Sequence, residues 1–496
     1  MGIPFYFYYL TKKYKDIIIS SLPSNINLYA IDFNGIIHPE ASKEHNEEKL
    51  NINLWKKIKS YNDIYKPNNI LICIDGVAPL AKIIQQRKRR YLTIYKNTID
   101  KTISEWDTNA ISPGTKFMTS LNDFIKNKII EEKKAFIFSG SNEEGEGEHK
   151  IFTYLKMMKS NNANYDNTPI VINGLDADLI ILSLISGLNN IYLMREGNDN
   201  LITYVNIDNL KKSLLDELKP KWNIDNDIEI IESYCVMCSI LGNDFIPHIL
   251  TLNIKNNGLN QLIDITSKAI NEYGSLVLNN KINQDCLTEI FTKISESEDV
   301  DIFTEINKFI EKKPRDFTLK SQEYAIKNKD KLLTDIYSNS KKWRYNYYKT
   351  LFDINVTVDS SLISITVENY IKGIYWTYNY YKKLDLDYEW FYPYNYPPTT
   401  KDISNYLKVN KVSEIINKGS FLPSDIQLLI ILPIQSNHLL NEKYKSFTTD
   451  ITKGLKHLFP VEFKIQTFLK THLWECCPIL PMINIERITK INNAKS

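Results

Sequence analysis

The stretch NILICIDGVAPLAKIIQQRKRR, residues 69–90, contains the two patterns that decide the fold. Its first part, NILICID, is a short apolar run that ends in an aspartate, which is typical of a buried strand. After a turn that includes Gly76 and Pro79, the remaining residues have the apolar spacing of a helix. A strand followed directly by a helix is the repeating unit of a sheet with parallel strands.

Three more runs have the same form, each followed by turn residues and then by a helical pattern. They are NLYAID (27–32), KAFIFSG (134–140) and PIVING (169–174). The sequence therefore predicts an α/β fold with a mostly parallel central sheet flanked by helices. Ligands of such sheets bind beyond the carboxyl ends of the strands, and acidic residues gather at that edge. These residues are Asp32, Asp75, Glu146, Glu148, Asp176 and Asp178, and Asp244 follows in LGNDF.

Each acidic motif taken alone has an ordinary interpretation, such as a solvated loop, a helix cap or a helix end. Together they would repel strongly, by about 4 kcal/mol for two carboxylates about 4 Å apart at an effective dielectric constant near 20. Divalent cations relieve this repulsion, and carboxylates without His or Cys favour Mg²⁺ or Mn²⁺. Two such ions suit phosphodiester hydrolysis. In GEGE (145–148) we expect an extended segment whose glycines let the backbone approach the ions.

A basic helix follows Asp75. Lys82, Gln86, Arg89 and Arg90 lie at helical spacing on one face. A solvated face or a nuclear-localisation patch in RKRR would also explain these charges. Beside an acidic metal site, however, arginine forks and a lysine suit a terminal phosphate group, which carries more charge than an internal one.

Composition constrains the class of protein more than its partners. The 496 residues are 43% hydrophobic, and 61 basic residues nearly balance 59 acidic ones. No apolar run approaches the ~18 residues of a membrane span, and the start of the chain lacks a signal pattern. We expect a monomer in the cytoplasm, with the nucleus as the alternative. Six irregularly spaced cysteines predict buried thiols rather than disulfides or a zinc site.

Three regions differ in composition. Residues 1–255 carry the acidic and basic motifs, and residues 256–340 are polar segments with helical patterns. Residues 341–496 are rich in aromatic side chains, and we expect an α+β region that packs on the catalytic region.

Several motifs resemble the signature blocks of the Xrn/Rat-type 5′→3′ exoribonucleases, in the order of that family. They are MGIP, IDFNGIIH (31–38), the segment 75–90, ISPGTKFM (111–118), GEGEHK (145–150), GLDADLI (174–180), GNDFIPH (242–248), WRYNYY (343–348) and EWFYPYNYPP (389–398). The resemblance is weak only between about 255 and 340. It implies a sheet like that of PIN and flap nucleases.

The resemblance also implies a role for each matching residue. The seven acids would bind two Mg²⁺ or Mn²⁺ ions, and Lys82, Gln86, Arg89 and Arg90 would form a 5′-monophosphate pocket. His38 would hold the terminal base against a tryptophan, for which both Trp376 and Trp390 are candidates. The chain departs from the family at 387–390 and at Asn395, and it ends soon after the second conserved region, as a minimal core would.

The resulting hypothesis is a processive exoribonuclease that degrades single-stranded RNA with a 5′-monophosphate. RNA-decay and decapping proteins are the partner classes it implies, and no motif identifies one. A structure-specific flap-type DNA nuclease and an RNA-binding protein that has lost catalysis are the alternatives. The sequence has no helix-hairpin-helix pattern after the last acid, which disfavours the first, and it retains every expected acid, which disfavours the second.

Overall fold

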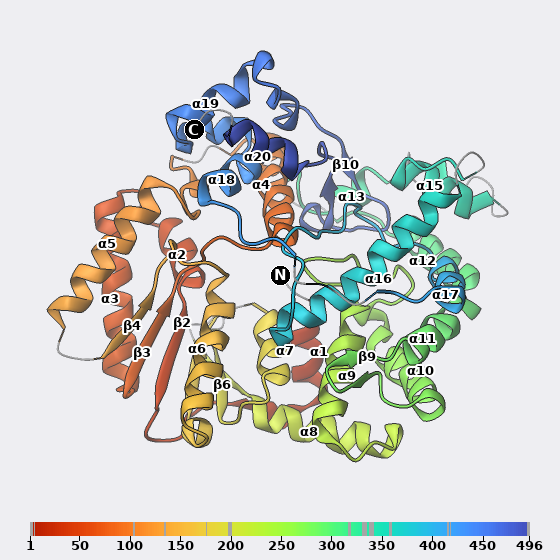
Figure 1. Ribbon diagram of the computed structural model, residues 1–496, viewed down its shortest axis with the longest axis horizontal. Coiled ribbons are helices and arrows are strands. Elements are labelled where there is room, and N and C mark those ends of the chain that lie inside the picture. Colours follow the sequence, from red (N-terminus) through yellow and green to blue (C-terminus); the bar gives the residue numbers. More distant parts are fainter. Residues whose placement is uncertain are drawn as a thin grey trace.

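A twisted seven-stranded sheet forms the centre of the first half of the protein (Figure 1). The computed structural model describes residues 3 and 5–493, apart from 103–104, 133–134, 175, 197–200, 316–318, 330–334, 337–341, 357–359, 414–415 and 417. The strand order is β1-β7-β6-β5-β2-β3-β4. The strands are β1 (Ile18–Ile19), β2 (Leu28–Asp32), β3 (Asn69–Cys73), β4 (Phe136–Ser139), β5 (Ile170–Asn173), β6 (Ile191–Glu196) and β7 (Ile202–Asn206).

Strands β2 to β6 are parallel, and β7 and β1 add an antiparallel edge. The central strand β2 pairs with β3 and β5 in register, so that Leu28 lies opposite both Asn69 and Ile170. All four predicted strands are present, and the predicted mostly parallel sheet is confirmed. The carboxyl ends of β2, β3, β4 and β5 therefore meet at one edge.

Helices cover both faces of the sheet. On one face, Tyr29 and Ile31 of β2 pack in a core with helices α3 and α5, and on the other, Leu28 and Ala30 pack in a core that includes α6, α7 and α9. This alternation follows from the two-residue period of a strand. The helices of this half are α1 (Tyr6–Lys13), α2 (Asn34–Ala41), α3 (Glu47–Tyr65), α4 (Leu80–Asp100), α5 (Lys116–Glu131), α6 (Gly147–Asn161), α7 (Asp178–Ile185), α8 (Ile207–Trp222) and α9 (Asp227–Ser239).

The rest of the chain is mainly helical and packs against the first half. Its elements are α10 (Gly258–Tyr273), β8 (Val277–Leu278), β9 (Lys281–Ile282), α11 (Gln284–Glu296), α12 (Glu298–Glu311), α13 (Tyr324–Lys327), α15 (Trp343–Phe352), α16 (Ser361–Lys382), α17 (Thr400–Val409), α18 (Ser424–Ile431), α19 (Glu442–Thr449), β10 (Ile465–Gln466), β11 (Cys477–Pro478) and α20 (Ile485–Asn493). Helix α16 runs diagonally from beside α15 towards α7, and Tyr370 on it donates to the carbonyl of Pro247 at 2.9 Å (Figure 1).

Helix α4 follows strand β3 and is hydrogen-bonded to segments near residues 458 and 481. Arg87 is 3% exposed and donates to the carbonyls of Leu458 at 2.6 Å and Pro481 at 2.7 Å. Residues 458 and 481 thus supply the partners that a buried guanidinium needs.

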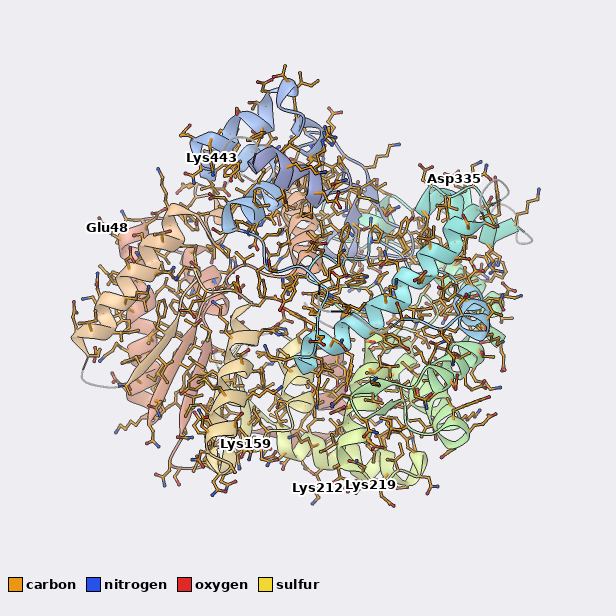
Figure 2. The ribbon with its side chains drawn as sticks, viewed as in Figure 1. Glu48, Lys159, Lys212, Lys219, Asp335 and Lys443 are labelled. Carbon is orange, nitrogen blue, oxygen red and sulfur yellow. The ribbon has the colours of Figure 1, made fainter. Side chains whose placement is uncertain are left out.

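Charged side chains lie mostly on the periphery, where Glu48, Lys212 and Lys443 project into solvent (Figure 2). None of the helices in the part of the chain that the structure describes combines the length and apolar character that crossing a membrane requires.

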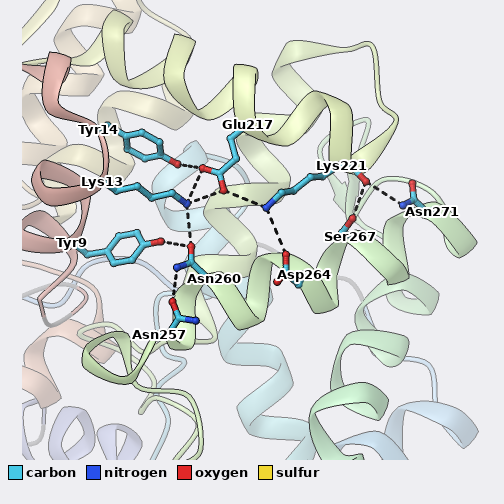
Figure 3. Close-up of polar contacts among 10 residues, drawn as sticks. All are labelled: Tyr9, Lys13, Tyr14, Glu217, Lys221, Asn257, Asn260, Asp264, Ser267 and Asn271. Carbon is cyan, nitrogen blue, oxygen red and sulfur yellow. Dashed lines mark hydrogen bonds and ion pairs between the residues drawn. The ribbon is translucent and has the colours of Figure 1, made fainter.

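Helix α1 is held to α8 and α10 by a polar network (Figure 3). Glu217 of α8 accepts hydrogen bonds from the Tyr14 hydroxyl and from Lys13 Nζ, the latter at 2.8 Å. Lys13 Nζ also donates to Asn260 Oδ1 of α10 at 3.0 Å, and the Tyr9 hydroxyl donates to the same oxygen. The partly buried Glu217 carboxylate therefore accepts hydrogen bonds from two side chains at the end of α1, those of Lys13 and Tyr14.

We expect Glu217→Ala to lower the free energy of unfolding by about 1–3 kcal/mol, because Lys13 and the Tyr14 hydroxyl lose a charged acceptor. Urea denaturation followed by circular dichroism measures this change. Lys221→Ala is the control, because Lys221 is an exposed partner of Glu217 at 3.4 Å and should cost less than about 1 kcal/mol. Equal losses in the two variants would show that α1 docks through its apolar side chains alone.

Candidate active site

Asp32 and Asp75 meet the start of helix α6 at the carboxyl edge of the sheet. Asp32 is the last residue of β2, and Asp75 lies two residues beyond the end of β3. The backbone N–H of Gly147 donates to Asp75 Oδ1 at 2.6 Å. A Cβ atom at Gly147 would lie 2.7 Å from Asp32 Oδ1, so only glycine allows this close approach.

The GEGE motif differs from its prediction. It was expected to be extended, but Gly147 begins α6, Glu146 is the N-cap residue and Glu148 lies in the first helical turn. The first N–H groups of a helix have no partner within the helix, and Asp75 satisfies one of them. Gly145 has φ +96°, which glycine adopts readily, and this turn delivers the chain to α6. The two glutamates are therefore oriented by a helix start and not by a strand.

Asp178, Asp176 and Asp244 come from two further segments. Asp178 is the first residue of α7 and is 2% exposed, and its backbone N–H donates to Asp176 Oδ1 at 3.4 Å. Asp244 lies in the loop after α9. We call these residues together the acid cluster: Asp32, Asp75, Glu146, Glu148, Asp176, Asp178 and Asp244.

The charges of the acid cluster act on one another. Burial raises the pKa of Asp32 well above its ordinary value, and the charges of Asp75 and Asp176 raise it further. Burial also raises the pKa of Glu148 strongly, with added repulsion from Asp176 and Asp178. Neutral or cation-bound carboxylates are therefore favoured at this edge.

Lys82 lies inside the acid cluster. Its Nζ atom is 2.6 Å from Glu146 Oε2 and 2.8 Å from Asp244 Oδ2. Burial alone would raise the pKa of Asp244, but the nearby positive charges, of which Lys82 is the largest and Arg89 another, together lower that pKa below the ordinary range. The sequence predicted Lys82 on a phosphate-binding face together with Arg89. In the structure, the Lys82 ammonium instead forms ion pairs with two carboxylates of the acid cluster. The reason is that Lys82 sits in the first turn of α4, directly beside the strand ends.

The other members of the basic helix lie farther along α4. Arg89 is exposed to solvent. Arg90 donates to the Asn109 side chain and, at 2.7 Å, to Ser112 Oγ. Burial and then the charge of Arg89 lower the pKa of Arg90 to about 10. Among the described residues, Gln86 Oε1 is buried without a hydrogen-bond partner.

His38 lies on α2 near Arg89 and Arg90 of α4. Desolvation by the surrounding protein, followed by the positive charges of Arg89 and Arg90, lowers the pKa of His38 to about 4. A neutral imidazole therefore stands beside these two arginines.

The two candidate tryptophans have different environments. Trp376 is fully buried, donates from Nε1 to the Asp387 carbonyl at 2.7 Å and stacks on Tyr380. It has no free face for a base in this structure. Trp390 is partly exposed and donates from Nε1 to Asn369 Oδ1 at 2.7 Å. Of the two, only Trp390 remains a candidate platform.

Helix α16 contributes residues to the site that the sequence did not identify. The Tyr380 hydroxyl donates to Glu146 Oε1 at 2.6 Å, and its ring stacks on His149 with the ring centroids 3.9 Å apart. Burial and the charge of Glu146 raise the pKa of Tyr380 strongly, so its hydroxyl keeps the proton that it donates. Tyr380 lies 234 residues from Glu146, and aromatic density in this segment was the only sequence signal.

The donor set fits a hard divalent cation. Asp32 Oδ1 and Glu148 Oε2 are buried, and neither has a hydrogen-bond partner among the residues that the structure describes. Each of Glu146, Glu148 and His149 offers a ligand atom within 4.8 Å of the others. The histidine was not part of the predicted set, although it directly follows Glu148. Buried carboxylate oxygens without a partner are stabilised by a cation.

Comparison with known proteins identifies the family of this chain. The model of the XRN 5′-3′ exonuclease N-terminus matches residues 1–197, and the model of the Xrn1 helical domain matches residues 221–342 and 318–494. The chain belongs to the XRN family. The family resemblance inferred from the sequence motifs is thereby confirmed.

Curated XRN relatives align with nearly the whole chain. The human protein 5′-3′ exoribonuclease 1 is 27% identical over 98% of this chain and 34% of its own length. The Drosophila melanogaster protein 5′-3′ exoribonuclease 2 homolog is 24% identical over 99% of this chain and 70% of its own length. The chain thus spans about a third of the human relative.

Among solved structures, that of the catalytic core of Rad2 in complex with a DNA substrate is similar to this chain. The match covers 64% of this chain and 81% of the Rad2 chain. Its TM-score is 0.34 and its identity is 11%.

Proposed function

We propose that this protein is a processive 5′→3′ exoribonuclease that degrades single-stranded RNA with a 5′-monophosphate to mononucleotides. Membership of the XRN family and the names of its curated relatives support this activity. The observation that carries the proposal is the acid cluster, with two buried carboxylate oxygens that lack a hydrogen-bond partner among the described residues. Such a cluster is costly without cations and suits phosphodiester hydrolysis with them.

The acid cluster would hold the metal, for which two Mg²⁺ or Mn²⁺ ions are the proposal. When bound, such ions activate water, orient it and stabilise the leaving oxygen. The chain's own residues prepare this site. Lys82 keeps Glu146 and Asp244 together, and the N–H of Gly147 fixes Asp75.

Recognition of the 5′ end is assigned to the middle of α4. A terminal monophosphate carries an extra charge and an extra oxygen compared with an internal phosphate. Arg89 is exposed and can bind this phosphate, the Gln86 side chain adds a neutral donor, and the Arg90 guanidinium adds positive charge. This placement explains why cleavage would begin at the end of a strand.

A base platform explains how any sequence is accepted. His38 and the partly exposed Trp390 are the proposed pair that holds the terminal base. Stacking contributes about 1–3 kcal/mol per base and is tolerant of sequence, because every base has an aromatic face.

The deciding experiment compares four substrates of the purified protein in Mn²⁺. These are single-stranded RNA with a 5′-monophosphate, the same RNA with a 5′-hydroxyl or 5′-triphosphate, and a flapped DNA. We expect mononucleotides from the monophosphate RNA alone. Equal degradation of the three RNAs would overturn end recognition, and preference for the flap would favour a DNA nuclease. Binding of RNA without any cleavage would favour a non-catalytic protein.

Arg89→Ala should reduce the preference for 5′-monophosphate over 5′-hydroxyl RNA by about 10- to 100-fold, the value of a hydrogen bond to a charged group. The ratio of kcat/KM for the two RNAs measures this preference. The control is Lys96→Ala, which removes an exposed charge from the same helix about 10 Å farther along. A similar loss in both variants would indicate a general electrostatic effect and contradict a pocket at Arg89.

A further inference from the structure

Both oxygens of the Glu146 carboxylate are held by side chains from distant segments. Lys82 Nζ lies 2.6 Å from Oε2, and the Tyr380 hydroxyl donates to Oε1 at 2.6 Å. The Tyr380 ring is fixed in turn, because it stacks between Trp376 at 4.9 Å and His149 at 3.9 Å. A carboxylate has about four lone-pair sites, so Glu146 retains capacity to bind a cation while its rotation is fixed.

A second buried glutamate on α9 has the same kinds of partner. The Tyr378 hydroxyl donates to Glu232 Oε2 at 2.7 Å, and Lys382 Nζ donates to Glu232 Oε1. Tyr378 and Tyr380 lie on the same helix and are 3% and 8% exposed, respectively. Glu232 is 4% exposed, like Glu146, but it is not a member of the acid cluster.

Comparing these two Tyr–Glu hydrogen bonds distinguishes a role in the packing of α16 from a role at the metal site. Either bond fastens α16 to the first half of the chain. The bond from Tyr380 reaches a carboxylate of the acid cluster, whereas the bond from Tyr378 reaches Glu232, which is outside it. Glu146 offers a ligand atom within 4.8 Å of ligand atoms of Glu148 and His149, so it stands where a cation could be bound.

We propose that Tyr380 is a positioning residue of the metal centre, whose hydroxyl holds the Glu146 carboxylate in the orientation that a divalent cation requires. This inference rests on the proposed function, because it needs Glu146 to be a ligand. Hydrogen bonds to metal ligands from the surrounding shell change metal affinity by about 10- to 100-fold. Helix α16 is then a part of the metal centre as well as a packing element.

The test is calorimetric titration of Mn²⁺ into metal-free wild-type protein, Tyr380→Phe and Tyr378→Phe. Phenylalanine keeps the ring and its stacking, so both variants lose one hydroxyl and one buried bond to a glutamate. We expect Tyr380→Phe to bind Mn²⁺ at least about 10-fold more weakly. Tyr378→Phe should bind Mn²⁺ as the wild type does, and both variants should show a similar fall in melting temperature.

The Mn²⁺ dependence of RNA cleavage provides a second measurement. The Mn²⁺ concentration for half-maximal cleavage should rise by the same factor in Tyr380→Phe, and the rate should recover at saturating Mn²⁺. A purely structural role would not be rescued in this way.

Three results would count against the inference, and they are distinguishable. Unchanged Mn²⁺ affinity in Tyr380→Phe would overturn the positioning role and leave the proposed function intact. Equal weakening in Tyr378→Phe would assign the effect to the docking of α16 and overturn the role as well. Absence of Mn²⁺ binding by the wild type would overturn the proposed function itself.

Discussion

Asp178→Asn should abolish RNA cleavage, with a loss of at least about 10³-fold, and leave the metal-free protein as stable as the wild type or more so. Asp178 is buried, and its pKa is raised strongly by burial and then by the charges of Asp176 and Asp244. Asparagine keeps the shape and removes one repelling charge. The activity and the stability of this variant therefore change in opposite directions, which a simple folding defect does not produce.

Two measurements on each protein check this prediction. Single-turnover cleavage of monophosphate RNA in Mn²⁺ gives the activity, and thermal unfolding in EDTA gives the stability. The control is Asp166→Asn, because Asp166 is fully buried and ion-paired with Lys159 outside the acid cluster. This control should lose stability and keep cleavage. Substantial activity in Asp178→Asn would remove this carboxylate from the catalytic set.

Lys82→Met should have the largest effect on stability. Lys82 is buried between Glu146 and Asp244, and removing one partner of a buried ion pair costs about 3–5 kcal/mol. The cost arises because uncompensated charges remain. A divalent cation takes over that compensation, so Mn²⁺ should recover much of the lost stability of the variant.

Urea denaturation with and without Mn²⁺ measures this recovery. Lys382→Met is the matched control, because Lys382 pairs with the buried Glu232, which lies outside the acid cluster. It should be destabilised to an extent that Mn²⁺ does not change. Equal recovery in both variants would mean that Mn²⁺ acts elsewhere, and no recovery in either would contradict a cation site beside Lys82.

Much of the sheet followed from local patterns. NLYAID and NILICID are continuous apolar runs between turn residues, and runs of this kind form strands that are buried on both faces. The antiparallel edge was missed, although IYLMRE and LITYVN flank GNDN, a group of residues typical of a hairpin turn. The polar residues within these runs weakened the apolar signal.

Six of the seven acids were predicted from their positions after strands, because parallel strands must end at a common edge, and Asp244 was predicted from its motif. The partners of these acids were not identified. Lys82 and Arg89 share a helical face by spacing, but spacing does not reveal that one is buried in the acid cluster and the other is exposed. Contacts such as that of Tyr380 with Glu146 depend on how the two halves pack, and no local pattern encodes them.

The anchoring of Arg87 has a consequence for biosynthesis. Translation proceeds from the amino end of a chain, so Arg87 is synthesised 371 residues before Leu458 and 394 residues before Pro481. At typical elongation rates of about 5–20 residues per second, the guanidinium waits roughly 20–80 s for these acceptors. The helix that carries Lys82 therefore gains these two hydrogen bonds only after residues 458 and 481 have been made, and a nascent fragment that already contains every acid still lacks them.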